Sequence, residues 1–214
     1  MPLLDPLIRR LEALGLAADR DALARIRRHS AILMDWNRAA RLVSAADACP
    51  AGLLRHFMES AEGLPWLASF RKVVDLGSGG GFPGAVWSAF FPSLPVVLVE
   101  ASRRKAAFLV ELRRELRLDA LEVVCERVDA PARLEALGGD LLTTRATGQG
   151  ELLLRAGRLA TGRPVRVILY PGRAAARRLA REDATGYVKV AECRLPSARG
   201  GSLWVMDRDV PRGT

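Results

Sequence analysis

Residues 75–81, with the sequence DLGSGGG, form a glycine-rich segment that could hold a small ligand against the backbone. The segment follows a short apolar run and precedes a helix expected near Pro83. This is the order of elements at the ligand site of an open α/β sheet. Glycine suits such a place because it has no Cβ to block a ligand and adopts positive φ without strain. The segment therefore predicts close contact between backbone and ligand.

Two carboxylates indicate which ligand this is. Asp75 stands before the first glycine, where a dinucleotide would present a pyrophosphate that a carboxylate repels, whereas S-adenosylmethionine presents an amino group and a positive sulfur. Glu100 ends the next apolar run and can accept hydrogen bonds from both hydroxyls of a ribose. NAD sites share that second acid, so Glu100 indicates a nucleoside without choosing between the two cofactors. The structural alternatives are a helix cap for Asp75 and a solvated strand end for Glu100.

Asp129 follows a third apolar run, where the edge of an adenine would lie in such a fold. A short acid and the neighbouring main chain could bind the exocyclic amine there. Taken alone, an aspartate after a strand is also a common turn residue. Asp129 is therefore a candidate for the cofactor site only together with Asp75 and Glu100.

Residues 143–146, TTRA, follow the fourth apolar run and bear on the methyl acceptor. They lack the Asn/Asp-Pro-Pro-aromatic turn typical of amine methylation, and none of the three cysteines fits attack through a pyrimidine C5. The remaining acceptor is an atom with a lone pair, such as guanine N7, which needs no general base. Catalysis would then be alignment and exclusion of water. Arg145 is the candidate catalytic residue, donating to the guanine or to the methionine carboxylate; a structural salt bridge is the alternative.

Short apolar runs alternate with helical segments in the middle of the chain, which predicts βαβ units and a parallel sheet covered on both faces. Two further runs, residues 187–191 and 203–206, have no helix between them and predict an antiparallel hairpin at the sheet edge. The predicted fold is a doubly wound, Rossmann-like α/β domain with a mostly parallel seven-stranded sheet. Its first five strands are expected at residues 73–76, 96–99, 121–125, 141–144 and 165–170.

Residues 1–68 are expected to form an N-terminal helical extension, and residues 69–214 the ligand-binding domain. Leu23, Ile26 and Leu33 recur at helical spacing, and Asp19 is a plausible N-cap for that helix. No internal repeat or low-complexity linker separates the two parts.

The net charge is +9, and arginines supply 30 of the 33 basic residues. Residues 151–214 hold 13 basic and 6 acidic side chains, which fits either a nucleic-acid surface or a solvated face. The three isolated cysteines argue against a disulfide framework and a metal site. No apolar run approaches the ~18 residues that span a bilayer, and the first residues do not resemble a signal peptide. We expect a cytoplasmic protein without a metal or a membrane.

Six segments together resemble the RsmG (GidB) family, bacterial methyltransferases that modify guanine N7 in 16S ribosomal RNA of the small subunit. The likeness covers most of residues 30–175, and GSGGGFPG is its most specific segment. The segments are WNRAARL at 36–42, RHFMES at 55–60, GSGGGFPG at 77–84, RKAAFL at 104–109, RVD at 127–129 and TRA at 144–146.

The resemblance implies S-adenosylmethionine as cofactor, S-adenosylhomocysteine as product, and ribosomal RNA or the small subunit as partner. We expect the enzyme to be a monomer. On the RNA side we expect Arg55, His56, Arg104 and Arg127, although His56 could instead be a packing histidine. The expected cofactor residues are Asp75, Gly77, Ser78, Gly79, Gly81, Phe82, Glu100, Ala101, Val128, Asp129 and Arg145.

The chain departs from the family pattern on the substrate side. The family's L-K-G is Tyr170-Pro171-Gly172 here, Arg41 replaces an asparagine, and Gly201-Ser202 stands where a basic pair is expected. Three alternatives therefore stay open: a divergent SAM-binding protein with another substrate, a basic RNA-binding module with a vestigial cofactor site, and an NAD oxidoreductase, which would need a pyrophosphate beside Asp75.

Overall fold

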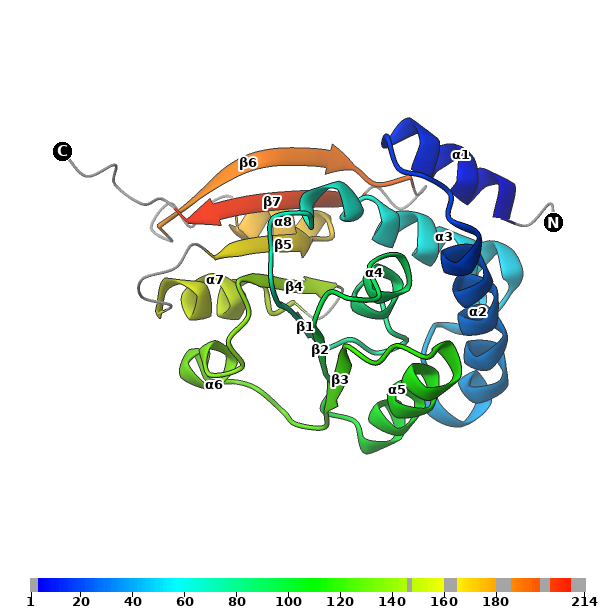
Figure 1. Ribbon diagram of the computed structural model, residues 1–214. Helices are drawn as coiled ribbons and strands as arrows, with labels where there is room; N and C mark the ends of the chain where they lie inside the picture. Colours follow the sequence, from blue (N-terminus) through cyan, green and yellow to red (C-terminus); the bar gives the residue numbers. More distant parts are fainter. Residues whose placement is uncertain (1–3, 146–147, 160–164, 180–185, 197–200, 209–214) are drawn as a thin grey trace.

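A seven-stranded sheet runs through the described part of the chain in the order β3-β2-β1-β4-β5-β7-β6 (Figure 1). The computed structural model describes residues 4–145, 148–159, 165–179, 186–196 and 201–208. The first five strands are parallel, and β7 pairs antiparallel with both β5 and β6. The strands are β1 (Val73–Leu76), β2 (Val96–Val99), β3 (Leu121–Val124), β4 (Leu141–Arg145), β5 (Arg166–Tyr170), β6 (Tyr187–Arg194) and β7 (Ser202–Arg208).

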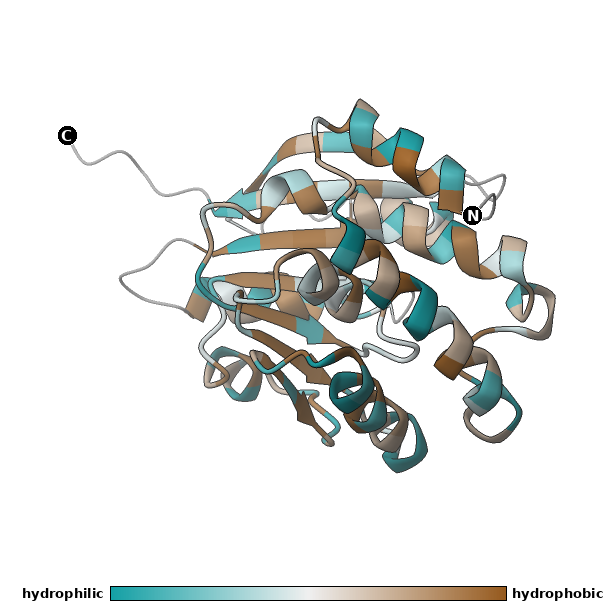
Figure 2. Ribbon diagram, turned by 45° about the vertical axis from the view of Figure 1, so that its right-hand side comes forward, coloured by the Kyte–Doolittle hydropathy of each residue, from teal (hydrophilic) through white to brown (hydrophobic). Residues whose placement is uncertain are grey.

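Alternate residues of each central strand point into two different cores, because successive side chains of a strand face opposite sides of the sheet. Val73 lies in the core shared with the N-terminal helices, whereas its neighbour Val74 lies in the core on the other face. Figure 2 shows the strands as predominantly hydrophobic ribbons between layers of helices. Burial on both faces explains why the sequence shows continuous apolar runs here.

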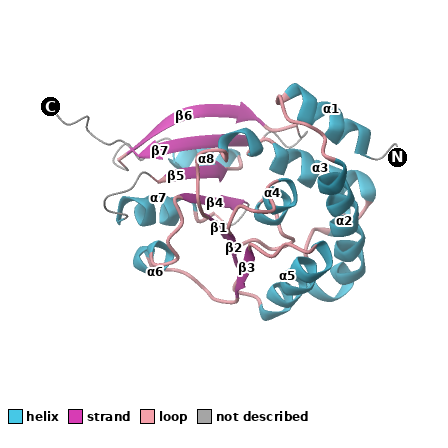
Figure 3. Cartoon of the chain, viewed as in Figure 1, coloured by secondary structure: helices cyan, strands magenta, loops and turns pink. Residues whose placement is uncertain are grey.

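Helices cover both faces of the sheet (Figure 3). On one face lie α4 (Gly84–Phe90) and α5 (Arg103–Leu116), together with the N-terminal helices. On the other face lie α6 (Pro131–Glu135), α7 (Gly150–Leu159) and α8 (Arg173–Leu179). The predicted doubly wound α/β fold with an antiparallel edge hairpin is confirmed.

The N-terminal segment folds into α1 (Asp5–Ala13), α2 (Arg20–Ala40) and α3 (Pro50–Ala61). The side chain of Asp19 accepts a hydrogen bond from Ala22 N at 2.9 Å and so caps α2 as predicted. These helices share one hydrophobic core with α4, α5 and the sheet. The predicted boundary at residue 68 stays a prediction.

Two short 3₁₀ turns, Ala45–Asp47 and Leu64–Trp66, flank α3. The first places the loop between α2 and α3 beside the carboxyl ends of β1 and β4. No helix in the described residues is both long and apolar enough to cross a bilayer.

Candidate functional site

The glycine-rich loop turns back over the ends of β1 and β2. Gly77 N and Ser78 N donate to Val99 O on β2 at 2.7 and 3.2 Å, and Gly81 N donates to Ser78 O at 2.7 Å. Positive φ values, which glycine adopts without strain, occur at Gly77, Gly79 and Gly81. The glycines therefore allow a tight turn whose backbone, rather than side chains, faces outward.

A cavity of about 450 Å³ lies over this loop, within the ~300–1,000 Å³ typical of small-molecule sites. The ends of β2 and β3, the loop before α3, and the end of β4 complete its walls. Of the predicted cofactor residues, the lining includes Gly77, Ser78, Gly79, Phe82, Glu100, Ala101, Val128 and Arg145, and of the predicted RNA residues His56 and Arg127.

Hydrogen bonds hold the Glu100 side chain at the edge of the cavity, so Glu100 is not a solvated strand end. Its side chain is largely buried. Its Oε2 accepts from Gly79 N at 3.0 Å, and its Oε1 accepts from Ser102 N at 2.8 Å, next to the start of α5. Each carboxylate oxygen has a second lone pair. The carboxylate is therefore held in one orientation and can still accept hydrogen bonds from a ligand.

Asp75 lies behind the loop, outside the cavity lining. It is fully buried, and its Oδ2 accepts from Gly84 N at 3.0 Å, while Oδ1 has no hydrogen-bond partner among the described residues. Burial raises the pKa of this carboxyl to about 7, although the Gly84 N–H opposes the shift. A Cβ at Gly84 would lie 2.8 Å from Oδ2. Asp75 thus accepts a hydrogen bond from the first residue of α4, which agrees with its alternative role as a helix cap.

Four other predicted residues also lie outside the lining: Gly81, Asp129, Arg104 and Arg55. Gly81 faces Ala85 and His29, which a Cβ at this glycine would approach to 3.0 and 3.2 Å. Asp129 is exposed after β3. Arg104 is exposed on α5, where it donates to a carbonyl at the end of α2 at 3.0 Å. The structure therefore does not place Gly81, Asp129 or Arg104 in the cavity lining.

Arg55 is part of an ion-pair network at the start of α3. Its guanidinium lies 2.8 Å from Asp47 Oδ1 and 3.0 Å from Glu59 Oε1. Asp47 Oδ2 also lies 3.6 Å from His56 Nε2. Arg55 is therefore engaged by two carboxylates, one of which, Asp47, lines the cavity.

Arg145 extends from the end of β4 into this network. Its guanidinium donates to His56 O at 3.2 Å and to His56 Nδ1, and lies 3.4 Å from Glu59 Oε2. It also lies 5.3 Å from the centre of the Phe82 ring. Burial lowers the pKa of Arg145 to about 10, so the side chain stays positively charged at neutral pH. The arginine is a fixed cation at the cavity wall.

Phe82 is the centre of an aromatic cluster that joins the loop to the N-terminal helices. Its ring stacks between His29 of α2, at a centroid distance of 5.2 Å, and His56 of α3, at 5.1 Å. Phe57 packs edge-on against it at 5.2 Å. The segment before residue 68 therefore supplies the support on which the loop rests.

Sequence reasoning missed several residues of the site. Asp47 belongs to a Ser-x-x-Asp turn, in which Ser44 Oγ donates to Asp47 Oδ2 at 2.8 Å. His29 occupies the buried face of α2, at helical spacing from Ile26 and Leu33. This helical spacing is the sequence signal that could have placed His29 in the core. Besides Asp47, the cavity residues that were not predicted are Leu42, Val43, Ser44, Leu76, Gly80, Val99, Lys105, Glu126 and Gln149.

A second cavity of about 410 Å³ lies at the carboxyl ends of β4 and β5. Thr144, Tyr170 and the turn at Pro171 form its base, and Arg173 and Arg178 of α8 line it. No group of three or more potential metal ligands occurs in the described residues.

Solved structures with a similar fold include a cofactor-bound protein, Rv0187 from MTB. It has a TM-score of 0.58 and 19% identity, over 90% of this chain and 91% of that chain. A variant of MtNAS solved with S-adenosylmethionine has a TM-score of 0.57 and 18% identity, over 86% and 74% of the two chains. At these identities the likeness concerns the fold.

Curated relatives are closer in sequence. Proteins named Ribosomal RNA small subunit methyltransferase G are 31% identical over 154 residues in Wolinella succinogenes and 41% identical over 140 residues in Acidiphilium cryptum. These matches cover 72% and 64% of this chain, and 77% and 61% of the relatives. In Pseudomonas aeruginosa (strain LESB58) the match is 35% over 127 residues and covers 59% of this chain but only 58% of that relative.

The family model GidB, described as rRNA small subunit methyltransferase G, matches residues 22–199. That range contains the glycine-rich loop, Glu100, Arg145 and both histidines that stack on Phe82. It also contains most of the sheet. The chain therefore belongs to the GidB family of rRNA small subunit methyltransferase G proteins.

Proposed function

We propose that this chain transfers a methyl group from S-adenosylmethionine to N7 of a guanine in small-subunit ribosomal RNA. The observation that carries the proposal is one cavity that brings together a bare glycine loop, the Glu100 carboxylate and the Arg145 guanidinium. The membership of the GidB family supports the same reaction.

The residues of the cavity fit the cofactor. A Cβ at Gly79 would meet only Gly77 O, at 3.8 Å, so the cavity side of this residue is open. Glu100 would accept the ribose hydroxyls, and Ala101 and Val128 would flank the adenine. When bound, S-adenosylmethionine would supply an electrophilic methyl group on a sulfonium.

The acceptor side requires orientation rather than proton transfer, because guanine N7 carries a lone pair and loses no proton. Arg145 would donate to the guanine O6 beside N7, and its contacts with His56 and Glu59 fix its direction. A donor that is already oriented lowers the entropy lost on reaching the reacting geometry. The Phe82 ring, which is 6% exposed, closes this wall against water.

The RNA would lie across the mouth of this cavity and across the second cavity, which forms a neighbouring groove beside α8. Arg127 and Lys105 line the cavity, and Arg173 and Arg178 line the groove. Arginine matches the geometry of phosphate. We propose that the chain acts as a monomer in the cytoplasm, on ribosomal RNA or the small subunit.

A transfer assay tests the proposal directly. Purified chain is incubated with methyl-labelled S-adenosylmethionine and either deproteinised 16S rRNA or small ribosomal subunits that lack the modification. We expect label in 7-methylguanosine after nuclease digestion, and a strongly reduced yield with Arg145→Ala. Label in another nucleoside would contradict the guanine assignment, and the absence of transfer to both substrates would contradict the activity.

A further inference from the structure

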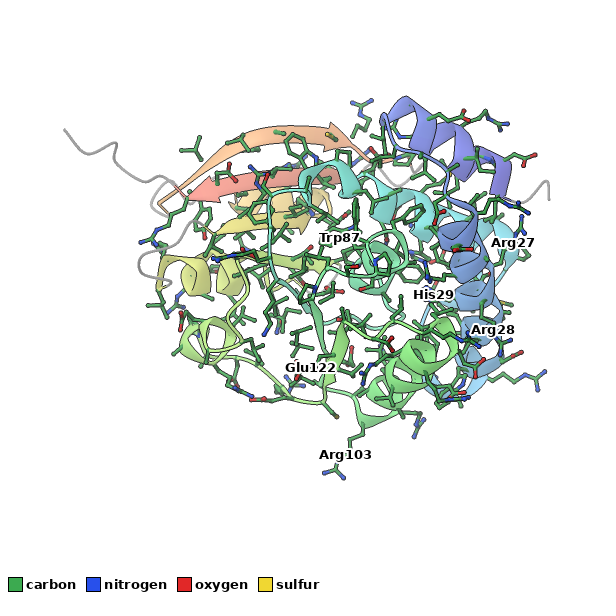
Figure 4. All side chains as sticks on the ribbon, in the orientation of Figure 1. Arg27, Arg28, His29, Trp87, Arg103 and Glu122 are labelled. Atoms are coloured by element: carbon green, nitrogen blue, oxygen red, sulfur yellow. The ribbon has the colours of Figure 1, made fainter. Side chains whose placement is uncertain are left out.

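His29 of α2, labelled in Figure 4, is fully buried, and its ring contacts the glycine loop. Its Nε2 lies 2.8 Å from Gly80 O. A carbonyl oxygen only accepts hydrogen bonds, so Nε2 carries the proton and donates. Nδ1 has no partner in the described residues. Burial lowers the pKa of His29 to about 4, so at neutral pH the ring is the neutral tautomer that has its proton on Nε2.

The same ring contacts three consecutive residues of the loop. It donates to Gly80, it lies close to the Cα of Gly81, where a Cβ would be 3.2 Å from His29 Cε1, and it stacks on Phe82 with an interplanar angle of 16°. Gly80 and Phe82 line the cavity, whereas His29 does not. His29 is thus one layer behind the surface that would meet the cofactor.

The surroundings of His29 are apolar. The rings of Phe57, Phe82 and Phe108 lie 5.2 to 6.3 Å from it. An apolar side chain of similar size would fill this space, but it would leave Gly80 O without a donor, and in the described residues no other donor reaches that oxygen. An unsatisfied buried carbonyl favours a different loop conformation. The hydrogen bond is what distinguishes histidine from an apolar residue here.

We propose that His29 is a positioning residue for the cofactor loop. Its hydrogen bond to Gly80 O and its stacking on Phe82 hold residues 80–82 in the shape that leaves Gly77 and Gly79 open toward the cavity. The helical segment before residue 68 then belongs to the cofactor site, because His29 supports the loop from the side that faces away from the cavity. The inference rests on the proposed function, in which that cavity binds S-adenosylmethionine.

Two substitutions separate the donor from the ring. His29→Phe keeps the aromatic stacking and removes the donor, whereas His29→Gln keeps an amide N–H donor and removes the ring. We expect His29→Phe to weaken S-adenosylhomocysteine binding about tenfold or more in calorimetry, and His29→Gln to stay within about threefold of wild type. In transfer assays, His29→Phe should raise KM for S-adenosylmethionine more than it lowers kcat.

Leu11→Ala is the matched control, because Leu11 is fully buried in α1 of the same core and is not among the loop's contacts. It should lower the melting temperature without changing S-adenosylhomocysteine affinity. Equal affinity of His29→Phe and wild type, or an equal loss in Leu11→Ala, would overturn the inference.

Hydrogen exchange of the ligand-free protein gives a reading that does not depend on the cofactor. Amides of residues 78–82 should exchange faster in His29→Phe than in wild type or Leu11→Ala. If the wild type bound no S-adenosylhomocysteine but this difference in exchange appeared, the proposed function would fail while the support of the loop by His29 stood. If the wild type bound and the exchange rates were equal, the inference alone would fail.

Discussion

Gly79 N donates to Glu100 Oε2 at 3.0 Å, so the glycine loop after β1 and the acid after β2 form one unit before any ligand binds. The hydrogen bond from Ser102 N to the other oxygen fixes the carboxylate further. This arrangement fixes one wall of the cavity over the loop. Under the proposed function, changes at Glu100 would therefore act on both the ligand and the loop.

Glu100→Ala should weaken S-adenosylhomocysteine binding by about two orders of magnitude, because hydrogen bonds to a charged acceptor contribute about 1.5–3 kcal/mol each. Isothermal calorimetry measures the change. Glu100→Gln is the matched variant: one oxygen remains as an acceptor, so its affinity should lie between those of wild type and Glu100→Ala. An unchanged affinity for Glu100→Ala would remove the residue from the cofactor site.

Gly79→Val should abolish cofactor binding, because a branched side chain would project from a residue with φ +53° on the open side of the loop. Gly138→Val provides the control, since Gly138 has φ +73° and no heavy atom within 4 Å of its Cβ position. Both variants carry backbone strain of about 1 kcal/mol or more, visible in thermal melting. Only Gly79→Val should lose binding; equal binding by the two variants would contradict the proposed ligand position.

Arg145→Lys should keep the positive charge but lose the planar fork that bonds His56 and approaches Glu59. We expect kcat for methyl transfer to fall about 100-fold, since loss of orientation at the reacting centre has effects of this size. Retention of RNA on filters should change much less. A kcat equal to that of wild type would show that Arg145 has a structural role only.

Two buried groups should make stability depend on pH with opposite signs. The pKa of His29 is lowered by burial to about 4, so the unfolded chain binds the extra proton and stability is lost as pH falls from 6.5 to 4. The pKa of Asp75 is raised to about 7, so the folded chain binds the extra proton and stability is lost as pH rises from 4 to 7.

Variants separate these two effects. The stability of wild type relative to His29→Gln should fall by about 3 kcal/mol between pH 6.5 and pH 4, at 1.36 kcal/mol per pKa unit. Wild type relative to Asp75→Asn should instead lose stability toward pH 7. Urea unfolding at a series of pH values gives both differences. A difference for His29→Gln that does not vary with pH would contradict the neutral, buried histidine.

Arg173 and Arg178 line the groove next to the cavity over the glycine loop and are exposed. Reversing both charges with glutamate should raise KM for RNA and flatten the dependence of RNA affinity on salt, because fewer phosphate contacts release fewer counterions. S-adenosylhomocysteine affinity should not change. Arg9→Glu combined with Arg20→Glu, at exposed positions of α1 and α2, is the control, because it changes the net charge by the same amount. An equal rise of KM in that variant would mean that the effect is not specific to the groove.

The sequence predicted those parts of the fold that depend on local patterns. The apolar runs of β1, β2, β4 and β5 became buried strands, because both of their faces are covered. Asp19 caps α2 through a hydrogen bond to Ala22 N, three residues ahead in the sequence. The glycine loop was also recognisable from the sequence, because the ability to adopt positive φ without strain depends on the glycine residue itself.

Side-chain direction was harder to predict, because tertiary contacts decide it. Asp75 points to Gly84 N rather than to the cavity because the chain turns back on itself at α4. Arg55 pairs with Asp47, which a separate turn brings near. His29 reaches Gly80 across 51 positions of sequence. None of these relationships is encoded in a short motif.

Mass mapping of 16S rRNA from cells with and without this gene tests the central claim most directly. The account predicts that the deletion removes one 7-methylguanosine, that the wild-type gene restores it, and that the Gly79→Val gene does not. Identical maps with and without the gene would contradict the assignment of this chain as the methyltransferase for that RNA.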